Sequence, residues 1–292
     1  MELWQRRSER REAMGLRPME IGVFLSSMGI QDPIAAVGKA KELGFRAIQT
    51  PPLARDWLTG AKQRNLVEAI RGAGLFVSAV CAGFEGESYA DIPTVKRTVG
   101  FVDPAVVNQR VSETIEYAEL ALELKSPVVT VHIGFVPEDR KDPVYRRQMD
   151  ATRKIADALQ KMGLLFGLET GQEEAALQKH FIEDVGRPNL KVNFDPANMI
   201  LYGKQKPIEA LEVLRHYVFH VHCKDGTWPT QPDQLGTEVP LGEGEVDIPA
   251  YMSKLKEMGY TYVLTIEREA GANRIADIMR AKALLERLRD EV

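Results

Sequence analysis

Cysteine is scarce in this chain of 292 residues, which contains only Cys81 and Cys223. Two cysteines cannot build the disulfide framework of a small secreted domain, and they suit a reducing compartment, so we expect a cytoplasmic protein. Long apolar runs are also lacking. None approaches the roughly 18–20 residues that a membrane-spanning helix requires, and we therefore expect no membrane partner.

The chain also lacks an excess of charge of one sign. Lys and Arg number 38 and Asp and Glu number 42, which gives a formal net charge of −4. A nearly balanced chain lacks the basic surface of a general nucleic-acid binder, so we expect no nucleic-acid partner. The composition is that of an ordinary globular protein, 44% hydrophobic with 23 Gly and 16 Pro, and supplies ample apolar chain for a large core.

The N-terminal residues 1–18 form a charged segment ahead of a single domain over 19–292. The segment lacks the apolar stretch of a secretory signal, and its acidic residues argue against a transit peptide. It is either a short helix or disordered arm outside the core, or an arm that joins copies in a homo-oligomer through Leu3 and Trp4. Both alternatives stay open. No Gly/Ser/Pro-rich linker divides the remainder, so we expect one domain.

From Met19 onward, short apolar runs alternate with amphipathic stretches. Strands are expected over 21–27, 46–50, 75–80, 127–133, 164–169, 190–195, 218–223 and 262–267. Helices are expected over 32–43, 54–72, 108–125, 143–162, 173–184, 207–215, 248–258 and 272–290. Continuous apolar strands are typical of parallel sheets that are buried on both faces. Eight strand–helix units predict an α/β fold, a single closed (β/α)8 TIM barrel.

A doubly wound open sheet is the structural alternative. It is disfavoured because the first strand is followed by SSMGIQD rather than by a glycine-rich phosphate-binding turn. Two long connections that look irregular, 84–107 and 224–246, follow strands and so belong to the C-terminal face, where barrel active sites lie. We expect them to be lids or binding loops rather than decorative insertions.

Four consecutive expected strands end on residues that can bind a metal. These are Glu169, Asp195, His222 and Glu267. Because strand ends in a barrel point toward a common mouth, the four side chains should converge. Three carboxylates and an imidazole suit one divalent ion, Mn²⁺, Mg²⁺, Co²⁺ or Zn²⁺, with positions left for substrate oxygens. Burying the carboxylates together without a cation would be costly, which favours a metal site over separate helix caps and core residues.

The motifs LETGQE, VNFDPANM, HVHCKD, PLGEGEV and TIERE resemble those of the sugar isomerase/epimerase superfamily of xylose isomerase-like TIM barrels. The resemblance covers about residues 19–290. The superfamily includes ketose 3-epimerases, hydroxypyruvate isomerases and inosose dehydratases. The resemblance implies that Glu169, Asp195, His222 and Glu267 hold one metal ion, and that Glu169 and Glu267 are also the catalytic acid and base.

The function implied by this resemblance is isomerisation or epimerisation of a sugar or sugar phosphate in carbohydrate metabolism. Proton transfer next to a carbonyl would proceed through a cis-enediolate. A metal-dependent dehydratase of a keto-sugar or keto-inositol is the alternative, because only the fate of the enediolate differs. An apurinic endonuclease of this fold is less favoured, since its trinuclear zinc site is rich in His and this chain has five. A non-catalytic barrel is disfavoured by the intact ligand set.

Substrate contacts are harder to assign, because the chain departs from the ketose epimerases. Asn198 stands where they have a His after the metal-binding Asp, and Trp228 stands where they have an Arg after the metal-binding His. His220 is either a core residue or a support for the ligands. The candidates for substrate binding are His132, Asn198, Lys224, Trp228 and Glu243.

Overall fold

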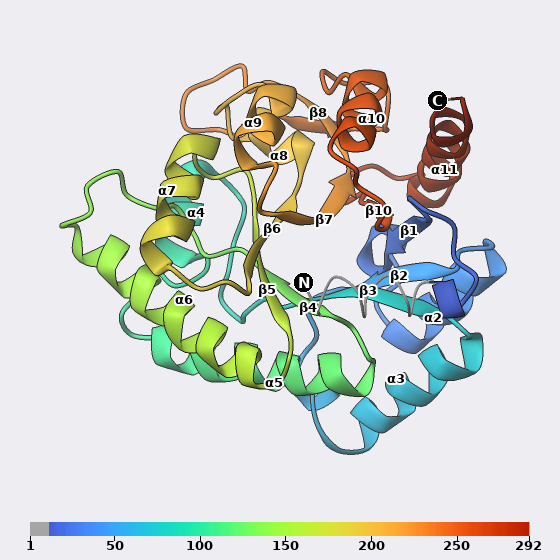
Figure 1. The fold of residues 1–292 in the computed structure, drawn as a ribbon, viewed down its shortest axis with the longest axis horizontal. Coiled ribbons are helices and arrows are strands. Elements are labelled where there is room, and N and C mark those ends of the chain that lie inside the picture. Colours follow the sequence, from blue (N-terminus) through green and yellow to red (C-terminus); the bar gives the residue numbers. More distant parts are fainter. Residues whose placement is uncertain (1–11, 292) are drawn as a thin grey trace.

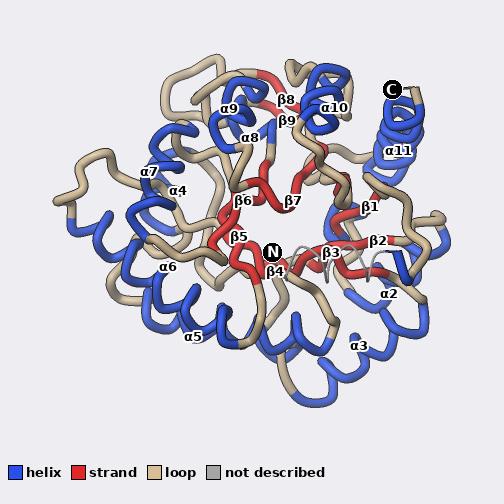
Figure 2. The backbone as a smooth tube through the Cα atoms, in the orientation of Figure 1, coloured by secondary structure: helices blue, strands red, loops and turns tan. Residues whose placement is uncertain are grey.

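The computed structural model describes residues 12–291 and shows a ring of parallel strands surrounded by helices (Figures 1 and 2). The barrel strands are β1 (Ile21–Phe24), β2 (Ala47–Thr50), β3 (Phe76–Cys81), β4 (Val128–Val131), β5 (Leu165–Glu169), β6 (Leu190–Phe194), β7 (Val218–Cys223) and β10 (Leu264–Ile266). Their order is β1-β10-β7-β6-β5-β4-β3-β2, and parallel pairing of β1 with β10 and with β2 closes the ring. The predicted single (β/α)8 barrel is confirmed, and the open sheet is excluded.

Helices cover the outside of the barrel (Figure 2). The expected ones are α2 (Pro33–Glu42), α3 (Gly60–Ala73), α5 (Val107–Glu123), α6 (Pro143–Lys161), α7 (Ala175–Val185), α9 (Pro207–Leu214), α10 (Ile248–Glu257) and α11 (Arg274–Asp290). Several begin at an Asp followed by Pro. Asp32, for example, accepts the Ala35 N–H at 2.7 Å, while Pro33 has no N–H to leave unpaired. This pair is the local reason that α2 starts where the sequence predicts.

Five connections, the two long ones among them, contain elements that the sequence analysis did not anticipate. Helix α4 (Ile92–Thr98) lies within 84–107, and a hairpin of β8 (Asp225–Thr227) and β9 (Thr237–Val239) lies within 224–246. A short helix, α8 (Pro196–Leu201), directly follows β6. Two 3-10 turns, η1 (Leu25–Met28) and η2 (Arg55–Trp57), follow β1 and β2. The expectation of irregular connections is wrong for these segments, because β8 and β9 pair with each other within 224–246 and α4 is capped locally by Asp91, which accepts the Thr94 N–H at 2.7 Å.

The described end of the N-terminal segment packs on the barrel. Leu16 is buried, and the guanidinium of Arg46 donates hydrogen bonds to the carbonyl oxygens of Met14 and Gly15. Leu3 and Trp4, on which the oligomer alternative depends, lie outside the described residues. Between residues 12 and 291, no helix combines the length and the apolar character needed to cross a membrane.

Candidate metal centre

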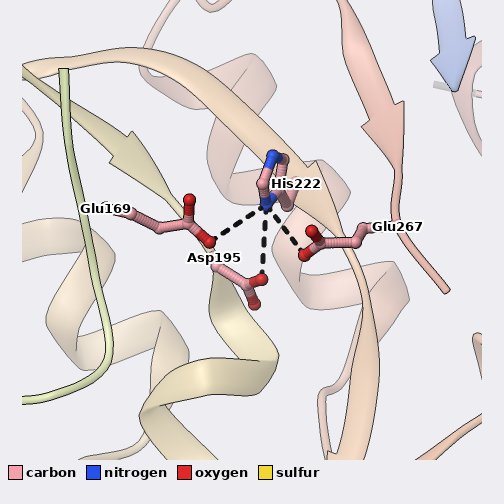
Figure 3. Close-up of side chains that lie close together, drawn as sticks. All are labelled: Glu169, Asp195, His222 and Glu267. Atoms are coloured by element: carbon pink, nitrogen blue, oxygen red, sulfur yellow. Dashed lines mark hydrogen bonds and ion pairs between the residues drawn. The ribbon is translucent and has the colours of Figure 1, made fainter. Parts of the chain in front are cut away.

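Four side chains from the C-terminal ends of four barrel strands meet at one buried point (Figure 3). Glu169 ends β5, Asp195 follows β6, His222 lies in β7 and Glu267 follows β10. One potential ligand atom from each lies within 4.8 Å of the others, and none of the four residues is more than 6% exposed. Because β5, β6, β7 and β10 are consecutive neighbours in the barrel, residues that lie almost a hundred positions apart in the sequence come together. We call these four residues the acidic cluster.

The imidazole of His222 lies at the middle of the acidic cluster. Its Nδ1 is 3.4 Å from Glu169 Oε1, 3.4 Å from Asp195 Oδ2 and 3.0 Å from Glu267 Oε2 (Figure 3). Its Nε2 lies 2.8 Å from Gln49 Oε1, and the Gln49 amide in turn donates to Thr130 Oγ1 at 3.3 Å. Because Gln49 presents an oxygen, the Nε2–H of His222 donates to it, and Nδ1 is the nitrogen that faces the carboxylates. Burial would lower the pKa of His222, but the carboxylates, Glu267 foremost, hold it well above its usual range, so Nδ1 also carries a proton here and a metal ion would take the place of that proton. This is the orientation that a metal-binding histidine needs.

Asp195 uses its two carboxylate oxygens for different purposes. Oδ1 accepts the Asn198 N–H at 3.0 Å and caps α8, whereas Oδ2 faces His222. The backbone N–H of Asp195 donates to Thr170 Oγ1 at 2.8 Å, which fixes the start of the helix. A helix cap and a place in the cluster are therefore compatible at this residue, although the sequence analysis treated them as alternatives.

Glu169 receives hydrogen bonds from two amides and lies against a second histidine. Asn193 Nδ2 donates to Oε2 at 3.1 Å and Asn198 Nδ2 donates to Oε1 at 3.2 Å, while His132 Nε2 is 3.3 Å from Oε1. Burial would raise the pKa of Glu169, but His132 and His222 outweigh it and hold that pKa well below its usual range. The structure thus brings two of the expected substrate-binding residues, His132 and Asn198, to the cluster.

Glu267 is paired with a buried lysine. Lys224 Nζ lies 3.2 Å from Glu267 Oε2, contacts Glu269, and is 4.0 Å from Asp195 Oδ2. Burial raises the pKa of Glu267 to about 7, against the opposing effects of His222 and Lys224. Burial would lower the pKa of Lys224, but the surrounding carboxylates, Glu267 foremost, hold it well above its usual range. Lys224 is therefore a third expected substrate-binding residue that reaches the cluster, and it arrives as a charged partner of Glu267.

The β8–β9 hairpin reaches back to the end of β10. Glu238 of β9 accepts hydrogen bonds from Arg268 Nη1 at 2.8 Å and from the Glu269 backbone N–H at 2.9 Å, and its other oxygen is 3.9 Å from Lys224 Nζ. The Arg268 Nε also donates to Asp277 of α11 at 3.0 Å. The hairpin that follows β7 is therefore tied to the two residues that directly follow Glu267.

Two other expected substrate-binding residues are not brought to the acidic cluster. The Trp228 backbone N–H donates to Glu245 at 2.9 Å, and the Glu243 carboxylate is exposed and 3.5 Å from Arg280. Their loop is organised by Asp225, whose carboxylate accepts backbone N–H groups from Gly226, Gly242, Gly244 and Val246 at 2.8–3.0 Å. A Cβ at Gly244 would lie 2.2 Å from Asp225 Oδ1, which explains a glycine there.

Sequence reasoning missed two amides that hold the cluster in place. Gln49 orients His222, and Asn193 donates to Glu169 while accepting a hydrogen bond from His220 Nδ1 at 2.8 Å. His220 therefore supports a cluster residue through Asn193. The available signal was a polar amide near the end of an otherwise apolar buried strand, in AIQT and in LKVNF. Such an amide must find partners inside the barrel.

The arrangement suits a divalent cation chemically. Three carboxylates and a neutral imidazole are oxygen and nitrogen donors of the kind that Mg²⁺, Mn²⁺, Co²⁺ and Zn²⁺ accept. The two glutamates approach His222 from β5 and β10, which are separated in the ring by β6 and β7. Carboxylates placed on two sides of one point can bind a cation between them and can also exchange protons with a ligand there.

Comparisons with known proteins agree with this fold. A family model described as a xylose isomerase-like TIM barrel matches residues 37–290. A solved xylose isomerase domain protein from Planctomyces limnophilus is 38% identical with a TM-score of 0.86, covering 94% of this chain and 98% of that one. A solved D-tagatose 3-epimerase-like protein is 21% identical with a TM-score of 0.75 and the same coverage.

Other relatives are more distant. An uncharacterised protein of Methanocaldococcus jannaschii is 28% identical over 204 residues, which span 63% of this chain and 65% of that protein. Structures of an L-ribulose 3-epimerase and of a probable 3-DHS dehydratase from Bacillus anthracis share the fold at 19% and 16% identity. At these identities the likeness concerns the fold alone. The match to the family model over most of the chain shows that this protein belongs to the xylose isomerase-like TIM barrel family.

Proposed function

We propose that the protein is a divalent-metal-dependent isomerase or epimerase of a sugar or sugar phosphate. One observation carries the proposal, namely the buried set of Glu169, Asp195, His222 and Glu267 with potential ligand atoms within 4.8 Å. These four residues would hold one ion, which when bound supplies Lewis-acid polarisation of a substrate carbonyl. Solved structures named as sugar 3-epimerases share the fold, which supports this class of reaction.

The protein's own contribution is to hold and move protons on two sides of the substrate. Glu169 and Glu267 are the acid/base pair of the proposal, because their carboxylates lie on different sides of His222. One removes the proton next to the carbonyl to give a cis-enediolate, and the other returns a proton to the opposite face, which inverts the carbon. Return to the neighbouring carbon is isomerisation. Asn198 and Lys224 hold these two carboxylates in place.

A dehydratase is the second candidate, and the position of His132 favours it. Elimination of a hydroxyl group needs a proton donor close to the carboxylate that removes the α-proton. His132 Nε2 is 3.3 Å from Glu169 Oε1, and although burial lowers the pKa of His132, Glu169 and nearby acids raise it to about 9. His132 is therefore protonated at neutral pH and able to donate to a leaving hydroxyl.

The test is proton NMR in D₂O with the Mg²⁺-loaded protein and a panel of ketoses. Loss of an α-proton signal, faster than with the Glu169→Gln variant, is the expected result and reports proton transfer whatever the product. An epimer or aldose signal identifies the main proposal, whereas a 2-keto-3-deoxy signal identifies the dehydratase. Absence of exchange with every ketose, in protein shown to contain metal, would contradict both.

A further inference from the structure

Three polar atoms beside the acidic cluster are buried without a hydrogen-bond partner. They are His132 Nδ1, Gln172 Nε2 and Glu173 Oε2. Gln172 and Glu173 are 2% and 5% exposed and lie in the loop that follows β5, directly after Glu169, whereas His132 follows β4. Because β4 and β5 are neighbours, the two loops leave the barrel side by side. Buried polar atoms in folded proteins normally have partners, so three such atoms at adjoining strand ends need an explanation.

His132 connects these atoms to the cluster. Its Nε2 faces Glu169 Oε1 at 3.3 Å, whereas its Nδ1, which the Cε1 atom separates from Nε2, has no hydrogen-bond partner. The ring of Tyr89 lies 5.7 Å from the His132 ring and covers it from the 84–107 connection. The unpartnered nitrogen is thus about one imidazole width away from a carboxylate of the acidic cluster.

Glu173 is buried without an ion pair. None of the ion pairs in residues 12–291 includes it, and the nearby ammonium of Lys204 lies 5.2 Å from the centre of the Phe135 ring. Burial raises the pKa of Glu173 to about 8, against smaller opposing effects of His132, the Val136 backbone amide and Lys204. The Gln172 amide lies beside the Tyr202 hydroxyl but makes no aligned hydrogen bond to it.

We propose that His132, Gln172 and Glu173 bind hydroxyl groups of an unphosphorylated sugar chain that extends from the reacting carbons. The proposal rests on the proposed function, because it concerns the remote part of the same substrate. A hydroxyl both donates and accepts hydrogen bonds, and the three side chains offer an amide donor, a carboxyl and an imidazole nitrogen. A phosphate dianion would lie against the Glu173 carboxyl, and the charges of His132 and Lys204 offset only part of the effect of burial on that carboxyl, so uncharged hydroxyl groups fit the three side chains better.

The test compares a long and a short substrate in the D₂O exchange assay with Mg²⁺-loaded protein. The long substrate is the D-ketohexose that the wild type exchanges fastest, and the short one is dihydroxyacetone, which is too short to reach the three side chains. Glu173→Leu should raise KM for the ketohexose about tenfold and leave exchange of dihydroxyacetone unchanged. Gln172→Leu should also raise KM for the ketohexose and leave exchange of dihydroxyacetone unchanged. The matched control is Glu174→Leu, at the exposed neighbouring position. This variant should change neither KM for the ketohexose nor exchange of dihydroxyacetone.

Several results would overturn the proposal. If Glu173→Leu impaired exchange of the ketohexose and of dihydroxyacetone equally, Glu173 would be a support for the acidic cluster. If it impaired exchange of neither substrate, ordered water alone would be the hydrogen-bond partner of these atoms. A lower KM of the wild type for the ketohexose 6-phosphate than for the ketohexose would mark an anion site instead.

Binding of D-glucitol separates failure of this proposal from failure of the proposed function. This six-carbon polyol has no carbonyl, so calorimetric titration detects its binding even if no ketose is exchanged. We expect about tenfold weaker binding to Glu173→Leu than to the wild type and to Glu174→Leu. Equal binding to all three proteins would refute the hydroxyl site, whatever the exchange assay shows.

Discussion

Replacement of Gln49 by Leu should weaken divalent metal binding although Gln49 is not itself a ligand in our proposal. Its Oε1 accepts the Nε2–H of His222 at 2.8 Å, which turns Nδ1 toward three carboxylate oxygens at 3.0–3.4 Å. Leu removes that acceptor, so the ring loses its fixed tautomer and its orientation. Loss of such a partner typically weakens metal binding by about 10–100-fold, which corresponds to about 1.4–2.7 kcal/mol.

The assay is Mn²⁺ binding to the purified protein, followed by electron paramagnetic resonance of free Mn²⁺. Gln49→Glu keeps an acceptor for His222 Nε2–H and should retain affinity better than Gln49→Leu. Asn189→Leu is the control, because it removes a buried amide at the opposite end of the barrel, where Asn189 donates to Ala156 O at 2.9 Å and Leu164 O at 3.2 Å. The control should lower Tm and leave Mn²⁺ affinity unchanged.

Wild-type Mn²⁺ affinity in Gln49→Leu would refute the reasoning about the tautomer. His222 would then be oriented by its contacts with the carboxylates alone. Absence of Mn²⁺ binding in the wild type is a different outcome, and it would refute the metal site itself.

Four further predictions concern the cluster and its loop. Chelation with EDTA should abolish activity and Mn²⁺ or Co²⁺ should restore it, while Asp195→Asn and His222→Ala should each weaken metal binding at least about tenfold; unchanged metal content in both variants would contradict the ligand assignment. Glu169→Gln and Glu267→Gln retain a coordinating oxygen but not a base, so turnover should fall about 100-fold or more with metal still bound, and wild-type turnover would make them structural ligands only. Metal affinity should rise as the pH increases through about 7, because Glu267 is protonated below its raised pKa and a proton competes with the metal there; a flat titration curve over that range would count against its role as a ligand. Gly244→Ala would place a Cβ 2.2 Å from Asp225 Oδ1 and should lower the free energy of unfolding by about 1–3 kcal/mol in urea denaturation, whereas unchanged stability would show that the loop relaxes freely.

The barrel and its four candidate ligands were predictable because their signals are local. Strands buried on both faces read as continuous apolar runs, and a residue that ends such a run must lie at the rim of the barrel. Glu169 and His222 could therefore be placed at the cluster without knowledge of any contact. The start of α2 was predictable for the same reason, since Asp32 and Pro33 act within one turn.

Other parts of the site were not predictable because they depend on partners far away in the sequence. Gln49 is significant only through His222, 173 positions later, and nothing near Gln49 indicates that contact. The position of the β8–β9 hairpin against the barrel depends on Glu238 meeting Arg268, a contact that a reading of 224–246 alone does not contain. Glu173 illustrates a third difficulty, because burial of one of two adjacent glutamates depends on how the loop after β5 folds.

The β8–β9 hairpin and the loop after β5 differ in how their side chains are bonded to the rest of the barrel. Glu238 ties the hairpin that follows β7 to Arg268 and Glu269, the residues after Glu267, so an insertion or deletion in this hairpin would misalign the candidate ligands. The loops after β4 and β5 are held near their starts, where the Gln148 amide donates to the backbone carbonyl oxygens of residues 133–135 and Thr170 exchanges hydrogen bonds with Asp195. The unpartnered polar atoms of Gln172 and Glu173 lie beyond the Thr170 contact. Under the proposed function, attempts to change the preferred sugar by mutagenesis should therefore begin with Gln172 and Glu173 and leave the hairpin intact.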